Sequence, residues 1–493
     1  MKWLVIFWFS FTLYGGVCPL TQTGSSVFGP GGQGYIDWHG FIPGTSTSTF
    51  RQNITNASVD PRSATWLTYN QNTGQGIVLQ NPQFQSDAFG EPWLGQVIHY
   101  VHGNAQRRMP VQGGVNGVDP GTMPVPNKPR IESYYGPFSR PQVGGQPPYF
   151  IAPGFYLMRN NGPSDAQMTI VDIDNCIEYD AYNCADNGAG IWCSNYGAYD
   201  MLAGDVQRPY AQGDVSNTSS VSGLPHMNGR LGWDEWIASN GIQHAIGVTM
   251  MNGVSAETPA FTGAATYAQS PGGTTTWSTD HIPFGSKIRL KASFDPVANG
   301  VPADCMPLIT VLKTYGAIFY DGGLTANTAS QETNNHWPWD CPSVAGGAML
   351  FSPANAEVVV QSQSKIYCLP GYTGCPDALP TGNAPTISRF AINSGSSATV
   401  TLSGAQQALL LSWSVSGVVD LDGNPVRLRY ISWGPKNRFG PGPIDGPGHD
   451  ENINVTVCSS NACDIQTAGT YTIQLMVQNR FGRSTATVTL SVR

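Results

Sequence analysis

LGWDEW (Leu231 to Trp236) opens the stretch of sequence that decides the fold of this chain. The stretch continues through IQHAIGVTM (Ile242 to Met250) and HIPFGSKIRLKASFD (His281 to Asp295), and it closes with LITVLKTYGAIFYDGG (Leu308 to Gly323). Strand-like apolar runs, acids, histidines and one amphipathic segment crowd together here. The stretch is therefore the first place to look for a site, although it contains no complete catalytic signature.

Periodicity predicts the elements of this stretch. GIQHAIGVTM (Gly241 to Met250) is typical of a strand. The segment from Lys287 to Phe294 alternates apolar residues with Lys and Arg, which predicts a strand with one solvated basic face. Apolar residues at helical spacing from Leu308 to Tyr320 predict one short helix, which Gly322-Gly323 should end.

Further strands are predicted on the N-terminal side of this stretch. They are ATWLTY (Ala64 to Tyr69), GIVLQ (Gly76 to Gln80), QVIHYVH (Gln96 to His102), FYLMR (Phe155 to Arg159) and MTIVDID (Met168 to Asp174). Residues 104–150 form a long Pro/Gly-rich stretch of the kind that often accompanies a binding surface. The segment from Cys176 to Asn195 is short and rich in cysteine and side-chain oxygens.

Composition sets the class of protein. The chain has 493 residues, of which 11% are charged and 11% aromatic, with 58 Gly and 37 Pro. That mixture favours two or three domains of short strands joined by polar loops, with enough aromatic residues for a real core. The net charge of -8 and the absence of a basic patch argue against a nucleic-acid partner.

The N-terminus predicts export. Lys2 precedes the uncharged run from Trp3 to Tyr14, so residues 1–18 are expected to be a secretory signal peptide. A lipoprotein site at Cys18 is the alternative, and the bulky Val17 counts against it. No other stretch is long and apolar enough to span a bilayer. The sequence therefore predicts a secreted or cell-surface protein with no transmembrane segment.

The ten cysteines agree with an oxidising compartment. Cys458 with Cys463, and Cys368 with Cys375, are close enough to close small disulfide loops. A distant partner, such as Cys305 or Cys341, is needed by one member of the group Cys176, Cys184 and Cys193. Metal thiolates are the alternative, and the absence of any CxxC counts against them.

Glycosylation sequons stand in polar, loop-like settings. They begin at Asn53, Asn56, Asn217 and Asn454. Such sequons also arise by chance in a chain rich in Ser, Thr and Asn. Their use depends on a eukaryotic host, so a glycoprotein is an expectation that the sequence leaves open.

A change of composition at residues 376–386 (PDALPTGNAPT) indicates a linker. After it, strands are expected at short spacing, as in a β-sandwich. These strands are SATVTLSG (Ser397 to Gly404), ALLLSWSVSG (Ala408 to Gly417), VRLRYISWG (Val426 to Gly434), NINVTVC (Asn452 to Cys458), GTYTIQLMVQN (Gly469 to Asn479) and STATVTLSV (Ser484 to Val492). Residues 386–493 resemble a PKD or bacterial Ig-like module. The resemblance implies a buried Trp413 and a corner at Tyr471, and such modules are generally spacers or adhesive appendages.

The main body also resembles a family. HAIGVTM, SKIRLKASFD and LKTYGAIFYDGG are similar to recurring segments of an uncharacterised family of secreted proteins. The resemblance covers roughly residues 150–325, and the loop from Glu257 to Asp280 departs from the family pattern. It implies export and a shared fold but no activity. We therefore expect an all-β protein with a large β-sandwich or jelly-roll-like body (residues 19–380), long loops and one short helix, followed by the Ig/PKD-like β-sandwich.

Acidic residues form the first candidate site. Sugar hydrolysis needs two carboxyl groups, one protonated and one ionised. Asp172 and Asp174 are two apart and should share a face of a strand. The acids proposed for catalysis are Asp172, Glu178, Glu235 and Asp321, with His244 as an acid/base or an orienting group. In the alternative, Glu235 flanks a turn, Asp321 ends the helix, and His244 hydrogen-bonds within the sheet.

Two further groups of residues suggest binding sites, one for calcium and one for a sugar. Asp172, Asp174 and Asp180 lie in an oxygen-rich segment that suits a structural calcium ion, although no EF-hand spacing fits and solvated turns are the alternative. Otherwise no cofactor is expected. Trp233, Trp337 and Trp339 stand in polar surroundings where an indole ring can bind the apolar face of a sugar. The alternative is that these rings pin long loops to the core.

These observations favour a secreted protein that engages an extracellular carbohydrate, and that acts on polysaccharide if its carboxyl groups are paired. The alternative is a non-catalytic matrix or cell-surface adhesion protein. The motifs GxSxG and HExxH, the P-loop and the dinucleotide fingerprint are absent, which disfavours those enzyme classes. An enzyme needs two ionisable groups converging in one cleft, so geometry separates the two hypotheses.

Overall fold

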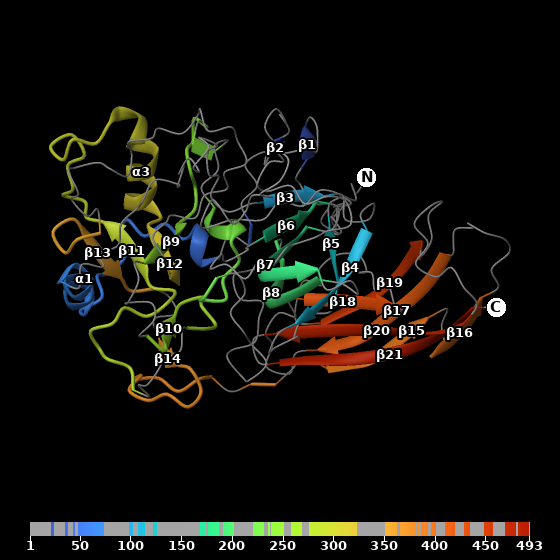
Figure 1. The fold of residues 1–493 in the computed structure, drawn as a ribbon. Helices are drawn as coiled ribbons and strands as arrows, with labels where there is room; N and C mark the ends of the chain where they lie inside the picture. Colours follow the sequence, from blue (N-terminus) through green and yellow to red (C-terminus); the bar gives the residue numbers. More distant parts are fainter. Residues whose placement is uncertain are drawn as a thin grey trace, which may run out of the picture.

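A computed structural model describes the parts of the chain that build most of the strands. The described residues are 21–23, 35–37, 43–44, 48–72, 98–101, 107–113, 122–125, 168–173, 176–186, 191–201, 220–230, 235–236, 238–250, 258–268, 276–322, 351–361, 365–380, 382–383, 386–392, 396–400, 410–419, 428–433, 448–456, 469–479 and 482–492. Strands dominate and helices are few in this part, so the fold is mainly β (Figure 1). No described helix is both long and apolar enough to cross a membrane.

A six-stranded sheet has the order β3-β6-β7-β8-β4-β5. Its strands are β3 (Ile98–Val101), β6 (Met168–Asp172), β7 (Ile177–Asp186), β8 (Ile191–Asp200), β4 (Arg107–Gly113) and β5 (Thr122–Val125). The strands predicted around β3 and β6 are confirmed. The cysteine-rich segment forms strands, and not the solvated turns that were the alternative to a calcium site there. β7 and β8 run through that segment as an antiparallel pair, in which Ile177, Tyr179 and Ala181 are buried.

A four-stranded sheet has the order β13-β11-β12-β9. It consists of β9 (Ile246–Met250), β11 (Lys287–Leu290), β12 (Ala317–Gly322) and β13 (Ala356–Val359), with β9 and β12 parallel. β10 (Ala260–Thr262) pairs with β14 (Ile366–Cys368) nearby. Helix α3 (Met306–Thr314) contacts β11, and the main described core lies around this sheet, where the rings of Phe284 and Phe319 stack 4.2 Å apart.

The predicted helix ends earlier than its apolar spacing indicated. Residues from Ala317 onward form β12, so Asp321 lies on a strand and does not end a helix. Gly316 makes the change of direction, with a φ of 77°. A Cβ atom at this position would lie 2.5 Å from the carbonyl oxygen of Ile288. The close approach to β11 therefore requires glycine, and the β-branched and aromatic residues that follow suit a strand.

The predicted basic face of β11 is buried, contrary to the expectation of a solvated face. Lys287 has no exposed surface, and its Nζ donates to the carbonyl oxygens of Thr49 (2.6 Å) and Gln52 (3.1 Å). Arg289 donates to the Ile54 carbonyl and pairs with Glu357 at 2.7 Å. The N-terminal segment around the short helix η1 (Thr49–Arg51) covers these cations. Alternation alone could not reveal a covering segment from far along the chain.

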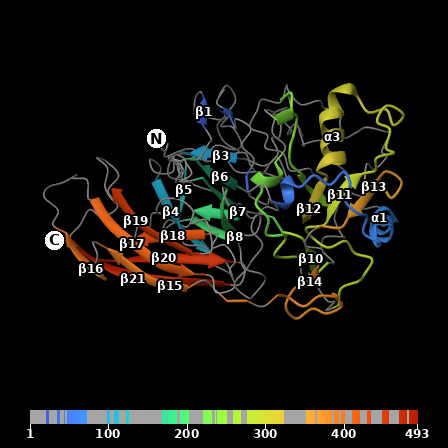
Figure 2. The ribbon, with the colours of Figure 1, turned by 180° about the vertical axis from the view of Figure 1, so that it is seen from behind.

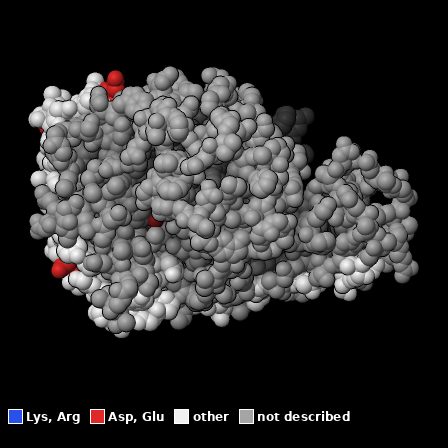
Figure 3. Space-filling view, viewed as in Figure 1, with Lys and Arg blue, Asp and Glu red and all other residues white. Residues whose placement is uncertain are grey.

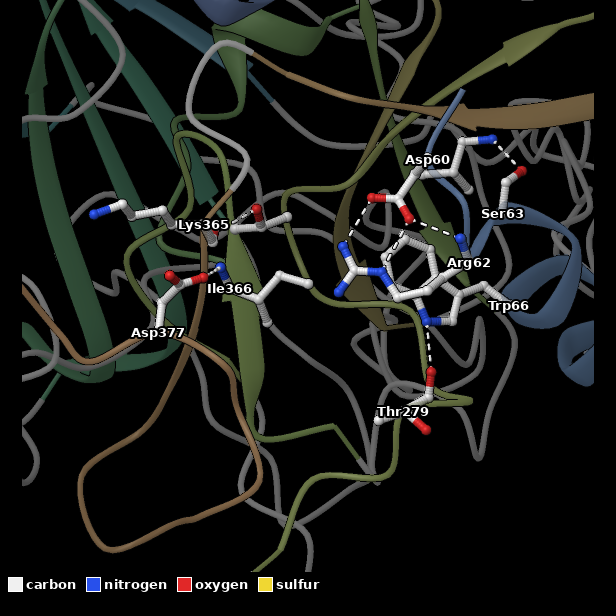
Figure 4. Close-up of polar contacts among 10 residues, drawn as sticks. Asp60, Arg62, Ser63, Trp66, Thr279, Lys365, Ile366 and Asp377 are labelled. Carbon is white, nitrogen blue, oxygen red and sulfur yellow. Dashed lines mark hydrogen bonds and ion pairs between the residues drawn. The ribbon is translucent and has the colours of Figure 1, made fainter. Parts of the chain in front are cut away.

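ATWLTY was predicted as a strand, and it forms helix α1 (Ser63–Asn72), which contacts β13. The turn at Asp60 starts the helix, because Asp60 Oδ1 accepts the backbone N–H of Arg62 at 2.8 Å. The Arg62 guanidinium pairs with Asp60 and lies 4.7 Å over the Trp66 ring (Figure 4). The Trp66 Nε1–H in turn donates to the Thr279 carbonyl at 2.9 Å. These tertiary contacts override the strand propensity of the run.

The C-terminal strands form two sheets. One has three strands: β15 (Thr386–Ile392), β17 (Leu410–Val419) and β19 (Gly448–Thr456). The other has the order β16 (Ser397–Val400), β21 (Gly482–Val492), β20 (Gly469–Asn479) and β18 (Leu428–Trp433). The six predicted strands are confirmed, and β15 was missed. Figures 1 and 2 show both sheets in orange and red beside the six-stranded sheet.

Shorter elements complete the described parts of the chain. β1 (Thr21–Thr23) pairs with β2 (Tyr35–Asp37), and two further turns of 3-10 helix are η3 (Met227–Gly229) and η5 (Ala303–Cys305). The predicted strands from Gly76 and from Phe155 lie outside the described residues. No described pairing joins a strand before Thr386 to one after it, and the domain boundaries stay a prediction.

Candidate functional site

Residues 220–230, which we call the bridging segment, lie between the two main-body sheets. On one side, the backbone N–H groups of His226 and Met227 donate to carboxylates on β7. On the other side, the Ser222 N–H donates to the Tyr320 carbonyl on β12 at 2.9 Å. The segment also approaches β9 so closely that a Cβ atom at Gly229 would lie 2.6 Å from the nitrogen of Gly247. Three of the candidate acids, Glu178, Glu235 and Asp321, contact this segment.

The first cluster, which we call the acid pair, consists of Glu178 and Asp180. They are two apart on β7, so both side chains project from the same face, and neither has exposed surface. Met227 N–H donates to Glu178 Oε1 at 2.9 Å, and His226 N–H donates to Asp180 Oδ2 at 3.2 Å. The Thr169 hydroxyl on β6 donates to Asp180 Oδ1 at 2.7 Å. Glu178 Oε2 has no hydrogen-bond partner among the described residues.

Burial controls the charge of this cluster. It raises the pKa of Glu178 well above the usual range, and the neighbouring charge of Asp180 raises it further, against the opposing Met227 N–H. Burial also lowers the pKa of His226, although Asp180 opposes that shift. The His226 Nδ1 lies 3.8 Å from Asp180 Oδ1, and its ring meets the Tyr320 ring edge-on at 5.4 Å. Burial therefore favours the protonated carboxyl group of Glu178 and the neutral imidazole of His226.

The second cluster, which we call the charge-paired triad, consists of Arg230, Glu235 and His244. Arg230 lies 3.3 Å from Glu235 Oε1, and His244 Nε2 lies 3.1 Å from Glu235 Oε2. The other ring nitrogen of His244 lies 2.9 Å from the Ala245 carbonyl. The Glu235 side chain is 10% exposed, whereas those of Arg230 and His244 are 3% and 1% exposed. This carboxylate has a guanidinium beside it, whereas no described Lys or Arg side chain forms an ion pair with the acid pair.

The structure separates the other predicted catalytic residues. Asp321 on β12 accepts the Val221 N–H at 3.2 Å, so it meets the opposite end of the bridging segment. Asp172 pairs with Ile177 across β6 and β7, whereas Glu178 pairs with Val171, so Asp172 and Glu178 project from opposite faces of the sheet. Of the five predicted catalytic residues, Glu235 and His244 are brought into direct contact, and Glu178 belongs to a different cluster.

The same register separates two of the three residues predicted for a calcium ion. Asp180 pairs with Thr169 and therefore projects from the face opposite to Asp172. β6 ends at Asp172, and Asp174 lies outside the described residues. No group of three or more His, Cys, Asp or Glu side chains in the described part of the chain is placed to hold a metal ion.

The disulfide between Cys368 and Cys375 is confirmed, with a Cα–Cα distance of 5.5 Å. Cys176 and Cys305 are also disulfide-bonded. Asn53 and Asn56 are exposed, and the Asn53 side chain accepts the Thr55 N–H at 2.9 Å, but Asn454 lies on strand β19 and not in a loop. Several predicted residues lie outside the described parts of the chain, namely Trp233, Trp337, Trp339, Asn217, Cys458 and Cys463.

His226 and Arg230 were not predicted as site residues, and Asp180 was predicted only as a metal ligand. A signal for them is visible in retrospect. The alternation IEYDAY from Ile177 places two acids on one strand face, and SGLPHMNGR from Ser222 offers a histidine and an arginine in a segment with little periodicity. The pairing of the two stretches could not be inferred, because they are separated by long, irregular sequence.

Comparisons with known proteins supply no assignment. No family model matches the chain, and no curated protein matches it. On the face drawn in Figure 3, the described acidic side chains appear at separate points, and no described Lys or Arg side chain is visible. The two buried clusters and the described surface are therefore the features that bear on the function.

Proposed function

We propose that this chain is a secreted protein that binds an extracellular carbohydrate without cleaving it, and that its C-terminal Ig/PKD-like sandwich is a spacer or adhesive module. One observation supports binding over hydrolysis: the predicted catalytic acids are buried and serve the fold. Glu178 accepts a backbone N–H, Glu235 is paired with Arg230 and His244, and Asp321 accepts a backbone N–H. A glycosidase acid must instead reach the glycosidic oxygen of a bound sugar.

The described surface that suits a sugar surrounds the Cys368–Cys375 disulfide, and we call it the tyrosine surface. Tyr267 and Tyr372 are partly exposed and pack against the core. Burial raises the pKa of the Tyr267 phenol, and the nearby Tyr372 raises it further, so Tyr267 stays a neutral hydrogen-bonding group. Half-buried tyrosines offer an apolar ring for sugar C–H groups and a hydroxyl for sugar oxygens.

Exposed hydroxyls and a rigid frame accompany these rings. The hydroxyls of Thr276 and Thr373 lie 3.1 Å apart on the surface. The loop that carries Tyr372 is closed by the disulfide, and the Asp377 carboxylate accepts the Ile366 N–H at 2.9 Å beside it (Figure 4). A rigid loop reduces the entropy lost on binding. The low charge of the chain favours an uncharged glycan as the ligand.

A glycan array probed with the mature chain tests this proposal, with mass spectrometry of every bound glycan. We expect binding without cleavage, and at least a tenfold weaker Kd in Tyr267→Ala and Tyr372→Ala. Tyr315→Ala is the matched control, because Tyr315 is also half-buried but follows helix α3. Binding that is equally strong in all three variants would contradict the tyrosine surface, and no binding to any glycan would move the proposal to a matrix or adhesion protein.

Hydrolysis is the second candidate function, and the charge-paired triad is the observation that favours it. Glu235 retains some exposure beside His244, which is a workable acid–base arrangement. If cleavage products appear on the array, we expect Glu235→Gln to remove them. Full activity in the double variant Glu178→Gln/Glu235→Gln would exclude these acids from catalysis.

A further inference from the structure

We propose that the acid pair and the bridging segment form an alkaline-sensitive latch between the two main-body sheets. The latch holds while Glu178 carries a proton, and it opens when Glu178 and Asp180 are both ionised. It does not depend on the proposed function.

The contacts make the bridging segment the connection. Two successive N–H groups, those of His226 and Met227, donate to the acid pair on β7. Tyr199 on β8 also donates its hydroxyl to the Gly223 carbonyl at 3.0 Å. Toward the other sheet, the segment donates through Ser222 to β12. Loss of the contacts with β7 would therefore weaken the attachment of the segment to the six-stranded sheet, where the Tyr199 contact remains, while the segment stays attached to β12.

The acid pair is arranged so that only one full charge is tolerated. Both carboxyl groups have no exposed surface and project from the same face of one strand. Each accepts a backbone N–H, and Asp180 also accepts the Thr169 hydroxyl. The remaining oxygen of Glu178 meets no hydrogen-bond partner at normal geometry among the described residues, and the neighbouring Asp180 side chain opposes its ionisation.

The groups that face the pair do not compensate a second charge. On β6 the facing group is the neutral Thr169, and on β8 Tyr199 stands opposite Glu178. From the bridging segment the facing group is His226, which burial keeps neutral, and behind it lies Tyr320 of β12. The next acid of β12, Asp321, accepts the Val221 N–H. No Lys or Arg side chain in the described part of the chain forms an ion pair with Glu178 or Asp180.

The direction of the pH effect follows from proton binding. A glutamate whose folded pKa is raised binds more protons in the folded state, so stability falls as pH rises from its usual pKa of about 4.3 to its folded value. A histidine whose folded pKa is lowered acts in the opposite sense below about pH 6.5. The two effects oppose each other between these limits. Above about pH 6.5 only Glu178 acts, and the latch weakens.

The bridging segment is also hydrogen-bonded to the backbone of the tyrosine surface. The Ser222 carbonyl accepts the N–H groups of Thr266 (3.0 Å) and Tyr267 (3.2 Å). Movement of the bridging segment would therefore disturb the backbone that carries Tyr267. Whether or not that surface binds a glycan, the opening itself can be measured on the full chain.

The test is urea unfolding and hydrogen exchange of the bridging segment at a series of pH values above about 6.5. Wild type should lose up to about tenfold in its folding equilibrium constant per pH unit, with exchange of residues 220–230 rising beyond the intrinsic pH effect. Glu178→Gln should abolish this loss. The control Asp295→Asn alters an exposed acid that accepts N–H groups of a turn, and it should behave as wild type. A Glu178→Gln profile parallel to wild type would overturn the latch.

A second variant keeps the test decisive if Glu178→Gln does not fold. Asp180→Asn removes the neighbouring charge that raises the pKa of Glu178, so the alkaline loss of stability should end at a lower pH and be smaller than in wild type. An unchanged stability profile in Asp180→Asn would overturn the proposal, because the charge of Asp180 would then not act on Glu178. Increased exchange confined to residues 220–230 supports a latch, and exchange that rises uniformly over the chain contradicts it.

Discussion

The acid pair and the charge-paired triad meet the same bridging segment, but they bury negative charge in opposite ways. Glu178 and Asp180 receive backbone N–H groups and a hydroxyl, and no guanidinium or ammonium group of a described residue forms an ion pair with them. Glu235 receives a guanidinium and an imidazole. A buried carboxyl without a cation keeps its proton, whereas a carboxylate beside Arg230 has a stable charge. The first cluster should therefore respond to pH, and the second should respond to the loss of a partner.

The largest effect is expected when the triad loses its cation. Arg230→Met removes the guanidinium that pairs with the buried Glu235, and we expect a loss of about 3–5 kcal/mol in the free energy of unfolding. Urea denaturation at neutral pH measures it. The double variant Arg230→Met/Glu235→Leu should lose less than the single variant, because it leaves no uncompensated charge. A larger loss in the double variant would show that packing, and not charge, dominates here.

Neutralising one acid in each cluster tests the comparison directly. Glu235→Gln leaves Arg230 without its anion, and we expect a cost of about 2–3 kcal/mol in the free energy of unfolding. Glu178→Gln replaces a carboxyl group whose protonated form is favoured by burial, and it should cost less than about 1 kcal/mol. Denaturation of both variants at one pH gives the difference. Equal costs would show that Glu178 is ionised and that the two clusters are alike.

The close approach at Gly229 links the clusters and can be perturbed by one methyl group. In Gly229→Ala, the new Cβ meets the backbone of Gly247 and the ring of Phe50, which is 2.9 Å away. We expect a loss of about 1–3 kcal/mol and a steeper response to alkaline pH. Gly241→Ala is the control, since its Cβ has nothing within 4 Å although its φ is 63°. A smaller effect at Gly229 than at Gly241 would contradict the packed position of the segment.

The smallest effect separates His226 from Glu178. In the Glu178→Gln background, stability should fall as pH drops below about 6.5, by at most about 1.4 kcal/mol per pH unit, because the buried imidazole must gain a charge. Thermal unfolding over this range measures it, and Glu178→Gln/His226→Asn should show no such fall. A persistent fall in the double variant would assign the acid sensitivity to another group.

Local patterns predicted those elements whose partners are near in the sequence or whose faces are uniform. The strands β3, β6 and β17 to β21 follow from β-branched runs, and the Cys368–Cys375 disulfide follows from its short spacing. The same reasoning failed where contacts join residues that are far apart in the sequence. Lys287 is buried because a segment from near residue 50 supplies carbonyl oxygens. Helix α1 forms where Asp60 accepts a backbone N–H before its first residue and the Thr279 carbonyl accepts the indole N–H of Trp66.

The candidate site shows the same limit. Glu235 and His244 are nine residues apart in the sequence, and their side chains are in contact. Glu178 was chosen as a catalytic acid because it follows a strand, yet it lies within strand β7 with its carboxyl group turned toward the bridging segment. Its partners Met227 and His226 come from a stretch without periodicity, so no local pattern could reveal that this acid is buried and protonated.

The measurement that tests this account most directly is the protonation state of Glu178 in the folded chain. Infrared difference spectroscopy of wild type and Glu178→Gln at neutral pH detects the carbonyl stretch of a protonated carboxylic acid. We expect such a band in wild type, its absence in Glu178→Gln, and its loss from wild type as pH rises together with faster exchange of residues 220–230. A wild-type spectrum at neutral pH that contains only ionised carboxylates would contradict both the latch and the distinction between the two clusters.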